Sequence, residues 1–589
     1  MGQTLGELFR AFRTQRHISM KQAANGLNTA TISRFERGQG DISLKIAGQL
    51  MFNIGMGVDD LGEMLGAQTQ GFPNGLQEII KGQRTALATK VDTFLQQQTC
   101  AEPLAALIRQ IQPFLRLPET EDRHLPLTLE QTLADRLAYP SKWSNFELYL
   151  ISSAVPFASH ELTTLLWQRL TALTGQTLGY QRQALWRLAL VALLHNDKPL
   201  YAQIAADMQR ISPIPALQIH FNSVMPQFLA ISAIAEHRDP APILGALRRV
   251  GATQLAAFLD HSVQTAGAKH AWHNQVIEDH YDSALAIDPD AKLMFGPTLA
   301  RLRKQRGLTV KDVIGDWSAA AQSRFENGKT TLGFHSTLTL MQRLLVPTSQ
   351  MQAATDATST FRRYRLKAYT MASNFQQAHY TRDDLVNLLE EFRRTTPNFP
   401  EGLRVMYQAG LTTAFHWAAP GALPDHDPLY ADATPSEQKA IVDYFRSLTT
   451  LSSQDMELLN LNINRIDQTY YDELVTVVLA RIKPQSNVAA QLFDNCDNFI
   501  YGAVYFHVDS VIPKLTAAFT HESWLLSWWP ICEVTELQTL AQVYQHDTEA
   551  TRQAAAQLIA DTRTLCPFDN TANYSEHWLT AYRGQCRQQ

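Results

Sequence analysis

A seven-residue motif occurs twice in this chain, 290 positions apart. Residues 32–38 read Ile-Ser-Arg-Phe-Glu-Arg-Gly, and residues 322–328 read Gln-Ser-Arg-Phe-Glu-Asn-Gly. When the sequence is shifted by 290 without a gap, thirteen positions between 6 and 51 are identical, far more than composition alone predicts. The repeated unit is about 300 residues long, too long for a solenoid repeat. We therefore expect a tandem duplication, in which a whole multi-domain protein was copied and fused.

The residues around the first motif predict a helix-turn-helix domain. Ser19, Asn28 and Ser43 each precede a segment of helical periodicity and offer a side-chain oxygen to cap its first turn. Gly26 and Gly38 suit the turns because glycine tolerates positive φ. We expect short helices over residues 20–25, 29 to about 37, and from 44 onward. In this arrangement the helix that starts at residue 29 enters the major groove of DNA.

The residues expected to contact DNA lie on this helix or directly after it, where the first exposed turn meets base edges and the end meets phosphates. In the first domain they are Thr29, Thr31, Ser33, Arg34, Arg37 and Gln39. In the second domain they are Gln322, Ser323, Arg324, Asn327 and Lys329. Packing is an equally good interpretation of Ser33.

The two recognition helices differ at their first turn, because Ala319 and Ala321 stand where the first copy has Thr29 and Thr31. Alanine can only contact a thymine methyl group or pack, so the second helix offers less hydrogen-bonded readout. The second domain either reads a different half-site or mainly anchors phosphates.

A structural ion pair is expected inside each domain. Glu36 follows an apolar residue on the recognition helix, where a carboxylate is costly unless paired. Arg13 on the preceding helix is its expected partner, and the second copy keeps both residues as Arg303 and Glu326. Retention of the pair favours a scaffolding role over base reading.

The motif at residues 32–38, followed by Asp41-Ile42-Ser43, resembles that of the Rgg/GadR/MutR family of transcriptional regulators. Members have about the length of one half of this chain. The resemblance implies a DNA-binding domain joined to a helical-repeat domain that binds a short secreted peptide pheromone, so that quorum sensing would control transcription. Its implied partners are double-stranded DNA and a short signalling peptide.

Asparagines line the peptide groove of related peptide-sensing regulators, so the resemblance points to Asn460 and Asn464. Their spacing of four predicts one helix face, and a carboxamide can both donate to and accept from a peptide backbone. Solvated polar positions are the alternative interpretation.

Outside the motifs, helical periodicity dominates and no segment alternates like a strand. We expect an all-α chain with two repressor-type helix-turn-helix domains, each followed by a stacked helical-hairpin (TPR-like) array. The expected boundaries are residues 1–65 and 76–270 for the first copy, 271–291 for a solvated acidic linker, and 292–345 and 361–589 for the second copy.

Charge separates the predicted DNA-binding domains from the rest. Residues 1–50 hold seven Lys or Arg against three acids, and residues 291–345 hold nine against three, although the whole chain has a net charge of −5. The arrays are therefore acidic. Basic domains are what neutralisation of DNA phosphates requires.

Other function classes find little support in the sequence. It contains no Gly-x-Ser-x-Gly, phosphate-loop or dinucleotide motif, and its eighteen histidines show no metal-ligand spacing. We therefore expect no enzyme, no cofactor and no metal. The absence of an apolar run of about 18 residues predicts no membrane span, and five scattered cysteines suit a bacterial cytoplasm. The expected form is a monomeric pseudo-dimer or a homodimer. The alternative is a peptide- or protein-binding scaffold with degenerate DNA-binding domains.

Overall fold

The computed structural model describes most of the chain. The described residues are 4–65, 100–140, 143–172, 178–210, 238–269, 272–282, 295–346, 380–397, 399–418, 433–482, 496–518, 528–566 and 571–584, with shorter stretches between 72 and 96, between 229 and 236, between 364 and 371, and residue 429.

Two small helical domains carry the repeated motifs. Head 1 consists of α1 (Leu5–Gln15), α2 (Met20–Ala24), α3 (Thr29–Glu36), α4 (Leu44–Ile54) and α5 (Val58–Leu65), and head 2 of α19 (Phe295–Gln305), α20 (Val310–Val313), α21 (Ala319–Glu326) and α22 (Phe334–Arg343). Ser19, Asn28 and Ser43 cap α2, α3 and α4 as the sequence predicts, since each side-chain oxygen accepts a backbone N–H of the first turn.

The remaining helices form two arrays. Array 1 contains α6 (Gly75–Ile80), α7 (Arg84–Gln96), α8 (Glu102–Leu115), α9 (Leu127–Arg136), α10 (Asn145–Ala154), α11 (His160–Thr171), α12 (Leu178–Leu194), α13 (Lys198–Arg210), α16 (Ala241–Arg249) and α17 (Thr253–Gln264). Array 2 contains α25 (Arg382–Thr395), α26 (Glu401–Ala418), α27 (Pro435–Ser447), α28 (Ser453–Asn460), α29 (Gln468–Leu479), α31 (Cys496–Tyr505), α32 (Ile512–Ala518), α33 (Trp528–Gln545), α34 (Glu549–Leu565) and α35 (Thr571–Tyr582).

The fold is all-helical, with two helix-turn-helix domains, each followed along the chain by a helical array. Successive helices pack as hairpins, for example α12 with α13 and α26 with α27. Within the described residues, β-type backbone pairing is limited to an isolated antiparallel bridge between Ser43 and Gly333. No helix of the described part is long and apolar enough to span a membrane.

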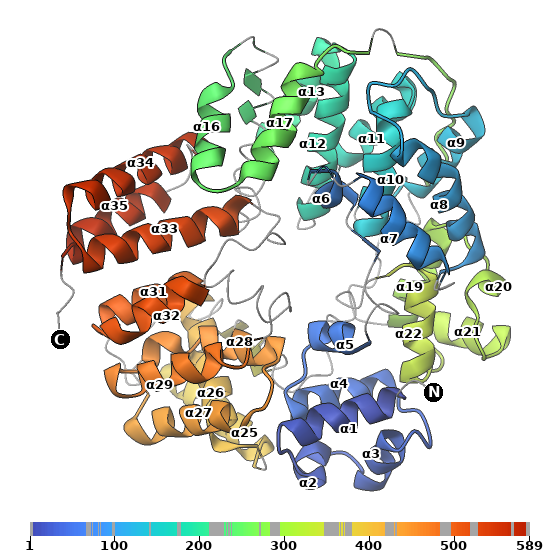
Figure 1. The fold of residues 1–589 in the computed structure, drawn as a ribbon. Helices are drawn as coiled ribbons and strands as arrows, with labels where there is room; N and C mark the ends of the chain where they lie inside the picture. Colours follow the sequence, from blue (N-terminus) through green and yellow to red (C-terminus); the bar gives the residue numbers. More distant parts are fainter. Residues whose placement is uncertain are drawn as a thin grey trace.

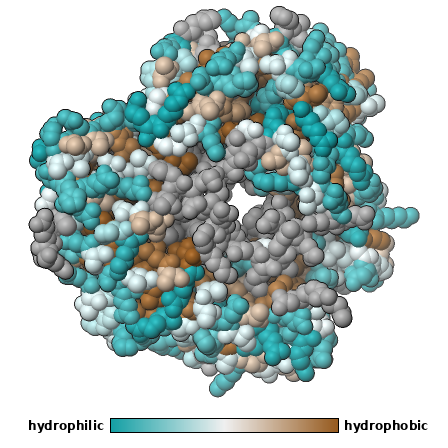
Figure 2. Space-filling view, in the orientation of Figure 1, coloured by the Kyte–Doolittle hydropathy of each residue, from teal (hydrophilic) through white to brown (hydrophobic). Residues whose placement is uncertain are grey.

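The heads and arrays are arranged as a closed ring (Figure 1), and hydrophilic residues cover most of its outer rim in this view (Figure 2). The ends of the two arrays meet where α16 packs against α34. There Arg249 donates two hydrogen bonds to Asp561, at 2.8 and 2.6 Å. Thr535 also donates to the backbone oxygen of Val250 at 3.1 Å. One junction of the ring therefore joins array to array.

The heads pack crosswise on the arrays. Head 1 precedes array 1 in the sequence but contacts array 2, where the Phe52 ring lies 5.2 Å from the rings of both Phe399 and Tyr407. Head 2 contacts array 1, where Ala101 N donates to Arg343 O at 2.9 Å. Each array thus holds the head of the other half.

The structure describes only part of the expected linkers. Most of residues 66–75 and all of residues 347–360 lie outside the described part of the chain. Between the two halves, residues 272–282 form a non-helical segment that we call the strap. It is hydrogen-bonded along array 1, for example from Glu278 N to Gln131 at 2.9 Å. The acidic residues Glu278, Asp279 and Asp282 of the expected linker are exposed, while its backbone finds partners on array 1.

Candidate nucleic-acid interface

The same close contact positions the predicted recognition helix in each head, which is α3 in head 1 and α21 in head 2. A Cβ added at Gly6 would overlap the backbone oxygen of Phe35, and a Cβ at Gly296 would overlap that of Phe325. The absence of a side chain therefore lets the first helix of each head lie directly against the end of the recognition helix. In head 1 the rings of Phe9 and Phe35 then meet edge to face, 5.3 Å apart.

A bidentate ion pair fixes this packing. Arg13 Nε and Nη2 each lie 2.7 Å from a Glu36 oxygen, and Arg13 Nη1 donates to Ile18 O at 2.7 Å. In head 2, Arg303 holds Glu326 at 2.7 and 2.6 Å and also donates to Leu308 O. Burial would raise the pKa of Glu326, but hydrogen bonds from Arg303 and Gln322 lower it below its ordinary value. The pair anchors the recognition helix to the first helix.

Most residues of the predicted DNA-contact set are accessible. Those that are exposed are Thr29, Arg34, Arg37, Gln39, Ser323, Arg324, Asn327 and Lys329, and those that are half-buried are Thr31 and Ser33. Arg37 Nε donates to Ser33 O at 3.1 Å, and Asn327 Nδ2 donates to Ser323 O at 2.7 Å. These equivalent side chains therefore lie back along their own helices.

Gln322 corrects the predicted set, because its side chain is fully buried. Its Oε1 accepts from Trp317 Nε1 at 2.8 Å, and its Nε2 donates to Glu326 at 2.9 Å. The equivalent residues of head 1 are Leu27 and Ile32, so a hydrogen-bonded pair replaces an apolar one in the second core. Gln322 therefore supports the helix and cannot read bases.

The two heads contact each other through equivalent residues. The bridge joins Ser43 to Gly333, which are 290 positions apart and so correspond in the two motif registers. Next to it Phe334 N donates to Ile42 O at 2.6 Å, and the Phe9 and Phe334 rings lie 5.9 Å apart, edge to face. This contact fixes the spacing between the two recognition helices.

Asp41 of head 1 completes a helix of head 2. The N-cap of α22 is Gly333, which has no side chain to offer. The Asp41 carboxylate accepts from His335 N at 3.2 and 3.3 Å. It thereby supplies the negative group that the first turn of a helix favours.

A buried ionic network joins head 1 to array 2. Arg16 donates to both Asp455 oxygens at 2.6 Å and also to the Tyr444 hydroxyl, and the Arg16 and Asp455 side chains have no exposed surface. Burial alone would lower the pKa of Arg16, but Asp455 and Tyr444 raise it above its ordinary value. Asp455 also completes the capping box of α28 by accepting from Ser452 N at 2.8 Å. The arginine thus binds the start of an array helix.

A carboxyl group of head 1 is buried beside this network. Asp60 accepts from Ser453 N and from Gly57 N, both at 2.6 Å. Burial raises the pKa of Asp60 to about 7, although the two backbone donors oppose the shift.

Head 2 meets array 1 in the same way. Arg306, which corresponds to Arg16, donates to Glu147 Oε1 from Nε at 3.1 Å and from Nη2 at 2.7 Å. Glu147 completes the capping box of α10 by accepting from Ser144 N at 2.8 Å. The guanidinium also lies over the Phe146 ring, 5.7 Å from its centroid.

Sequence reasoning missed these two interfaces, although two signals were present. Arg16 and Arg306 are identical under the shift of 290, and each array contains a Ser-x-x-acid capping box, at residues 144–147 and 452–455. What the sequence does not show is that the partners belong to opposite halves of the chain.

The predicted peptide-binding pair does not lie on one helix. Helix α28 ends at Asn460, and Asn464 falls in a separate 3-10 turn, η6 (Ile463–Arg465), so the assumption of a shared helix face is wrong. The side chain of Asn464 lies outside the described part of the structure. Asn460 Oδ1 accepts from Asn498 Nδ2 at 2.6 Å, which brings a second carboxamide, from α31, beside it.

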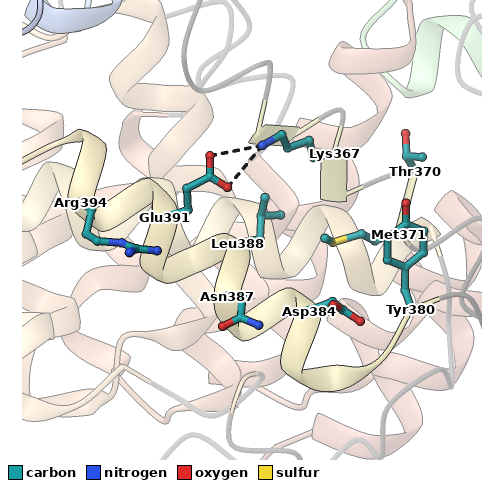
Figure 3. A pocket seen from close by; sticks show the side chains of 9 residues that line it. All are labelled: Lys367, Thr370, Met371, Tyr380, Asp384, Asn387, Leu388, Glu391 and Arg394. Atoms are coloured by element: carbon teal, nitrogen blue, oxygen red, sulfur yellow. Dashed lines mark hydrogen bonds and ion pairs between the residues drawn. The ribbon is translucent and has the colours of Figure 1, made fainter.

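A surface pocket of about 680 Å3 lies at the start of array 2 (Figure 3). Its lining comes from residues 364–371, from the residue Tyr380 before α25 and from one face of α25, and it consists of Lys367, Thr370, Met371, Tyr380, Asp384, Asn387, Leu388, Glu391 and Arg394. Lys367 Nζ lies 3.3 Å from both Glu391 oxygens. The pocket combines both signs of charge with an apolar part, a chemistry that suits a zwitterionic, partly apolar ligand.

The described residues contain no group of three or more His, Cys, Asp or Glu that could hold a metal ion.

Comparison with solved structures finds likeness to half of the chain. The SHP pheromone receptor Rgg2 of Streptococcus dysgalactiae matches with a TM-score of 0.34 and 16% identity, over 49% of this chain and 99% of the receptor. A bacterial peptide pheromone receptor in a pheromone complex matches with a TM-score of 0.36 and 12% identity, over 49% and 97%. The competence regulator ComR from Streptococcus vestibularis matches with a TM-score of 0.21 and 11% identity, over 49% and 98%.

No family model and no curated protein sequence matches the chain. Likeness to the solved structures at these TM-scores assigns no function to it.

Proposed function

We propose that this chain is a sequence-specific DNA-binding transcriptional regulator of the bacterial cytoplasm, built by fusion of two copies and acting as a pseudo-dimer under the control of a short peptide. The observation that carries the proposal is the pair of helix-turn-helix heads joined through equivalent residues. A contact between position 43 and position 333 is what a two-fold axis between identical subunits produces. Here both partners belong to one chain.

Base and phosphate contacts are assigned to the accessible face of each recognition helix. In head 1 the proposed contacts are Thr29, Thr31, Ser33, Arg34, Arg37 and Gln39, and in head 2 they are Ser323, Arg324, Asn327 and Lys329. The exposed cations of this set suit phosphates and guanine edges. Fusion makes the second half-site contact intramolecular, at an effective concentration on the order of millimolar.

Control by a peptide is assigned to array 2, with Asn460 and Asn464 as proposed contacts. Asn498 strengthens the choice of Asn460, because two adjacent carboxamides offer several donors and acceptors to a peptide backbone. The pocket around Arg394 is the competing location. Calorimetric titration with synthetic copies of short peptides encoded beside this gene tests both. Loss of binding in Asn460→Ala supports the first location, whereas loss only in Arg394→Ala assigns the peptide to the pocket.

Double substitution of the equivalent arginines tests the DNA proposal. We expect Arg34→Ala with Arg324→Ala to weaken binding to DNA from upstream of the gene and to lower its salt slope by about 1.8, because each lost phosphate contact lowers the slope by about 0.9. Fluorescence anisotropy at several salt concentrations measures the slope. The matched control is Arg248→Ala, an exposed arginine of α16 that lies in an array.

Unchanged DNA binding in the folded double variant would contradict the assignment of these helices. Absence of salt-dependent binding in the unmodified protein would favour a scaffold with degenerate heads. Ala319 and Ala321 support this alternative, because alanine offers no hydrogen bonds to bases.

A further inference from the structure

The strap is an extended segment bound on the surface of a helical array. Residues 272–282 contain no helix and run along array 1 between the end of α17 and the start of head 2 (Figure 1, green trace). Every strap residue is at least partly exposed, and Val276 is 84% exposed. The strap therefore lies on the surface of the array, with Trp272 and Ile277 packed against its core.

Side chains of array 1 bind the strap through its backbone. Gln131 of α9 accepts from Glu278 N at 2.9 Å and donates to Glu278 O at 2.8 Å. One carboxamide therefore satisfies both backbone groups of a single residue, whatever its side chain. Glu161 accepts from Gln275 N at 3.0 Å, and the Tyr139 hydroxyl accepts from Asp282 N at 3.2 Å. These acceptors follow the strap over eight residues.

Aromatic side chains anchor both ends. Trp272 stacks on the buried His195 ring, with centroids 3.8 Å apart, and donates to Asp197 at 2.9 Å. At the other end, the Tyr281 and Tyr139 rings lie 5.5 Å apart. Backbone recognition between two aromatic anchors is the pattern by which a groove binds an extended peptide.

Charged and polar side chains also pair across this contact. The array carboxyl groups of Glu130 and Asp135 each lie 3.0 Å from a strap histidine, His273 and His280 respectively, and Arg169 of the array pairs with Asp279. Gln131, Glu161 and Tyr139, in contrast, accept from backbone N–H groups. Other extended peptides carry the same backbone groups, so such a peptide can take the place of the strap.

We propose that this edge of array 1 is a binding site for extended peptides, and that the strap is its resident, displaceable ligand. The site binds the backbone through Gln131, Glu161 and Tyr139, and it takes an aromatic side chain at each end. It is separate from the peptide site proposed for array 2. Since residues 283–294 connect the strap to head 2, displacement of the strap lengthens the tether of that head.

The test uses a fluorescein-labelled synthetic peptide of residues 272–282 and the full-length protein. The strap is weakened by Trp272→Ala with Tyr281→Ala, which leaves the array side of the site intact. We expect anisotropy to detect binding to this variant at least about tenfold tighter than to the unmodified protein, because the chain's own strap no longer competes. Addition of Gln131→Ala removes two backbone hydrogen bonds and should weaken peptide binding about tenfold.

Gln168→Ala is the matched control, since Gln168 is an exposed glutamine of α11. No peptide binding by the strap-weakened variant with its circular dichroism unchanged, or equal loss with Gln131→Ala and Gln168→Ala, overturns the proposal. A second measurement needs no added peptide. Hydrogen exchange of the Glu278 amide should accelerate in Gln131→Ala and stay protected in Gln168→Ala, and equal protection in both also overturns it.

Discussion

The two junctions between heads and arrays use the same type of ion pair but differ in the number of buried partners around it. At both, an arginine of the head binds the carboxylate that caps an array helix, Arg16 to Asp455 and Arg306 to Glu147. The first junction adds the Tyr444 hydroxyl and the buried Asp60. Both junctions join opposite halves of the chain, so the two halves share this connection and differ in the partners that surround it.

The largest expected difference comes from removing the junction arginines. We expect Arg16→Met to lower the free energy of unfolding by about 3–5 kcal/mol, because Asp455 stays buried without its partner. Arg306→Met should cost about 1 kcal/mol less, since its network lacks the hydroxyl partner. Denaturant titration measures both, and Arg10→Met, at an exposed position of α1, is the control. Equal losses of unfolding free energy would show that the additional buried partners of the first junction do not contribute to stability.

The glycines under the recognition helices should behave alike. Gly6→Ala and Gly296→Ala each place a Cβ on a backbone oxygen, so we expect each to cost about 1–3 kcal/mol. Thermal unfolding of both variants checks this. Gly40→Ala, where the added Cβ meets nothing within 4 Å, should change stability little. A large effect in one head alone would break the equivalence of the heads.

Stability at the first junction should depend on pH through Asp60. Its pKa in the folded protein, about 7, lies above the ordinary value of 3.8. The folded state therefore holds a proton that the unfolded state releases, and stability falls as pH rises through this range. From pH 6 to pH 8 we expect a loss of about 1.4 kcal/mol. Asp60→Asn should remove this part of the pH dependence of the unfolding midpoint, and an unchanged slope would refute the assignment.

The smallest expected effect concerns the exchanged core pair of head 2. Gln322→Ile leaves Trp317 Nε1 without its acceptor and should cost about 1 kcal/mol. Adding Trp317→Leu restores the apolar pair of head 1 and should recover most of this loss. A double-mutant cycle in chemical unfolding measures the coupling, and additive effects would show that the two residues do not depend on each other.

Local features of the fold were predictable from sequence, because their causes are local. The caps at Ser19, Asn28 and Ser43 and the pairing of Arg13 with Glu36 follow from residue type and helical spacing. The crosswise packing was not predictable, because Arg16 and Asp455 are 439 positions apart and either array offers a similar capping box.

Two site predictions failed for identifiable reasons. Gln322 was assigned to DNA as a polar residue of the recognition helix, although the shift of 290 aligns it with the core residue Ile32. Asn460 and Asn464 were assumed to share a helix, but α28 ends between them.

A footprint on DNA from upstream of the gene, at two salt concentrations and with chain stoichiometry determined by sedimentation, tests the central claim most directly. The fused pseudo-dimer predicts that one chain protects two half-sites about one helical turn apart, with protection weakened by salt. Two chains per site, or no salt-dependent protection by the folded protein, would contradict it.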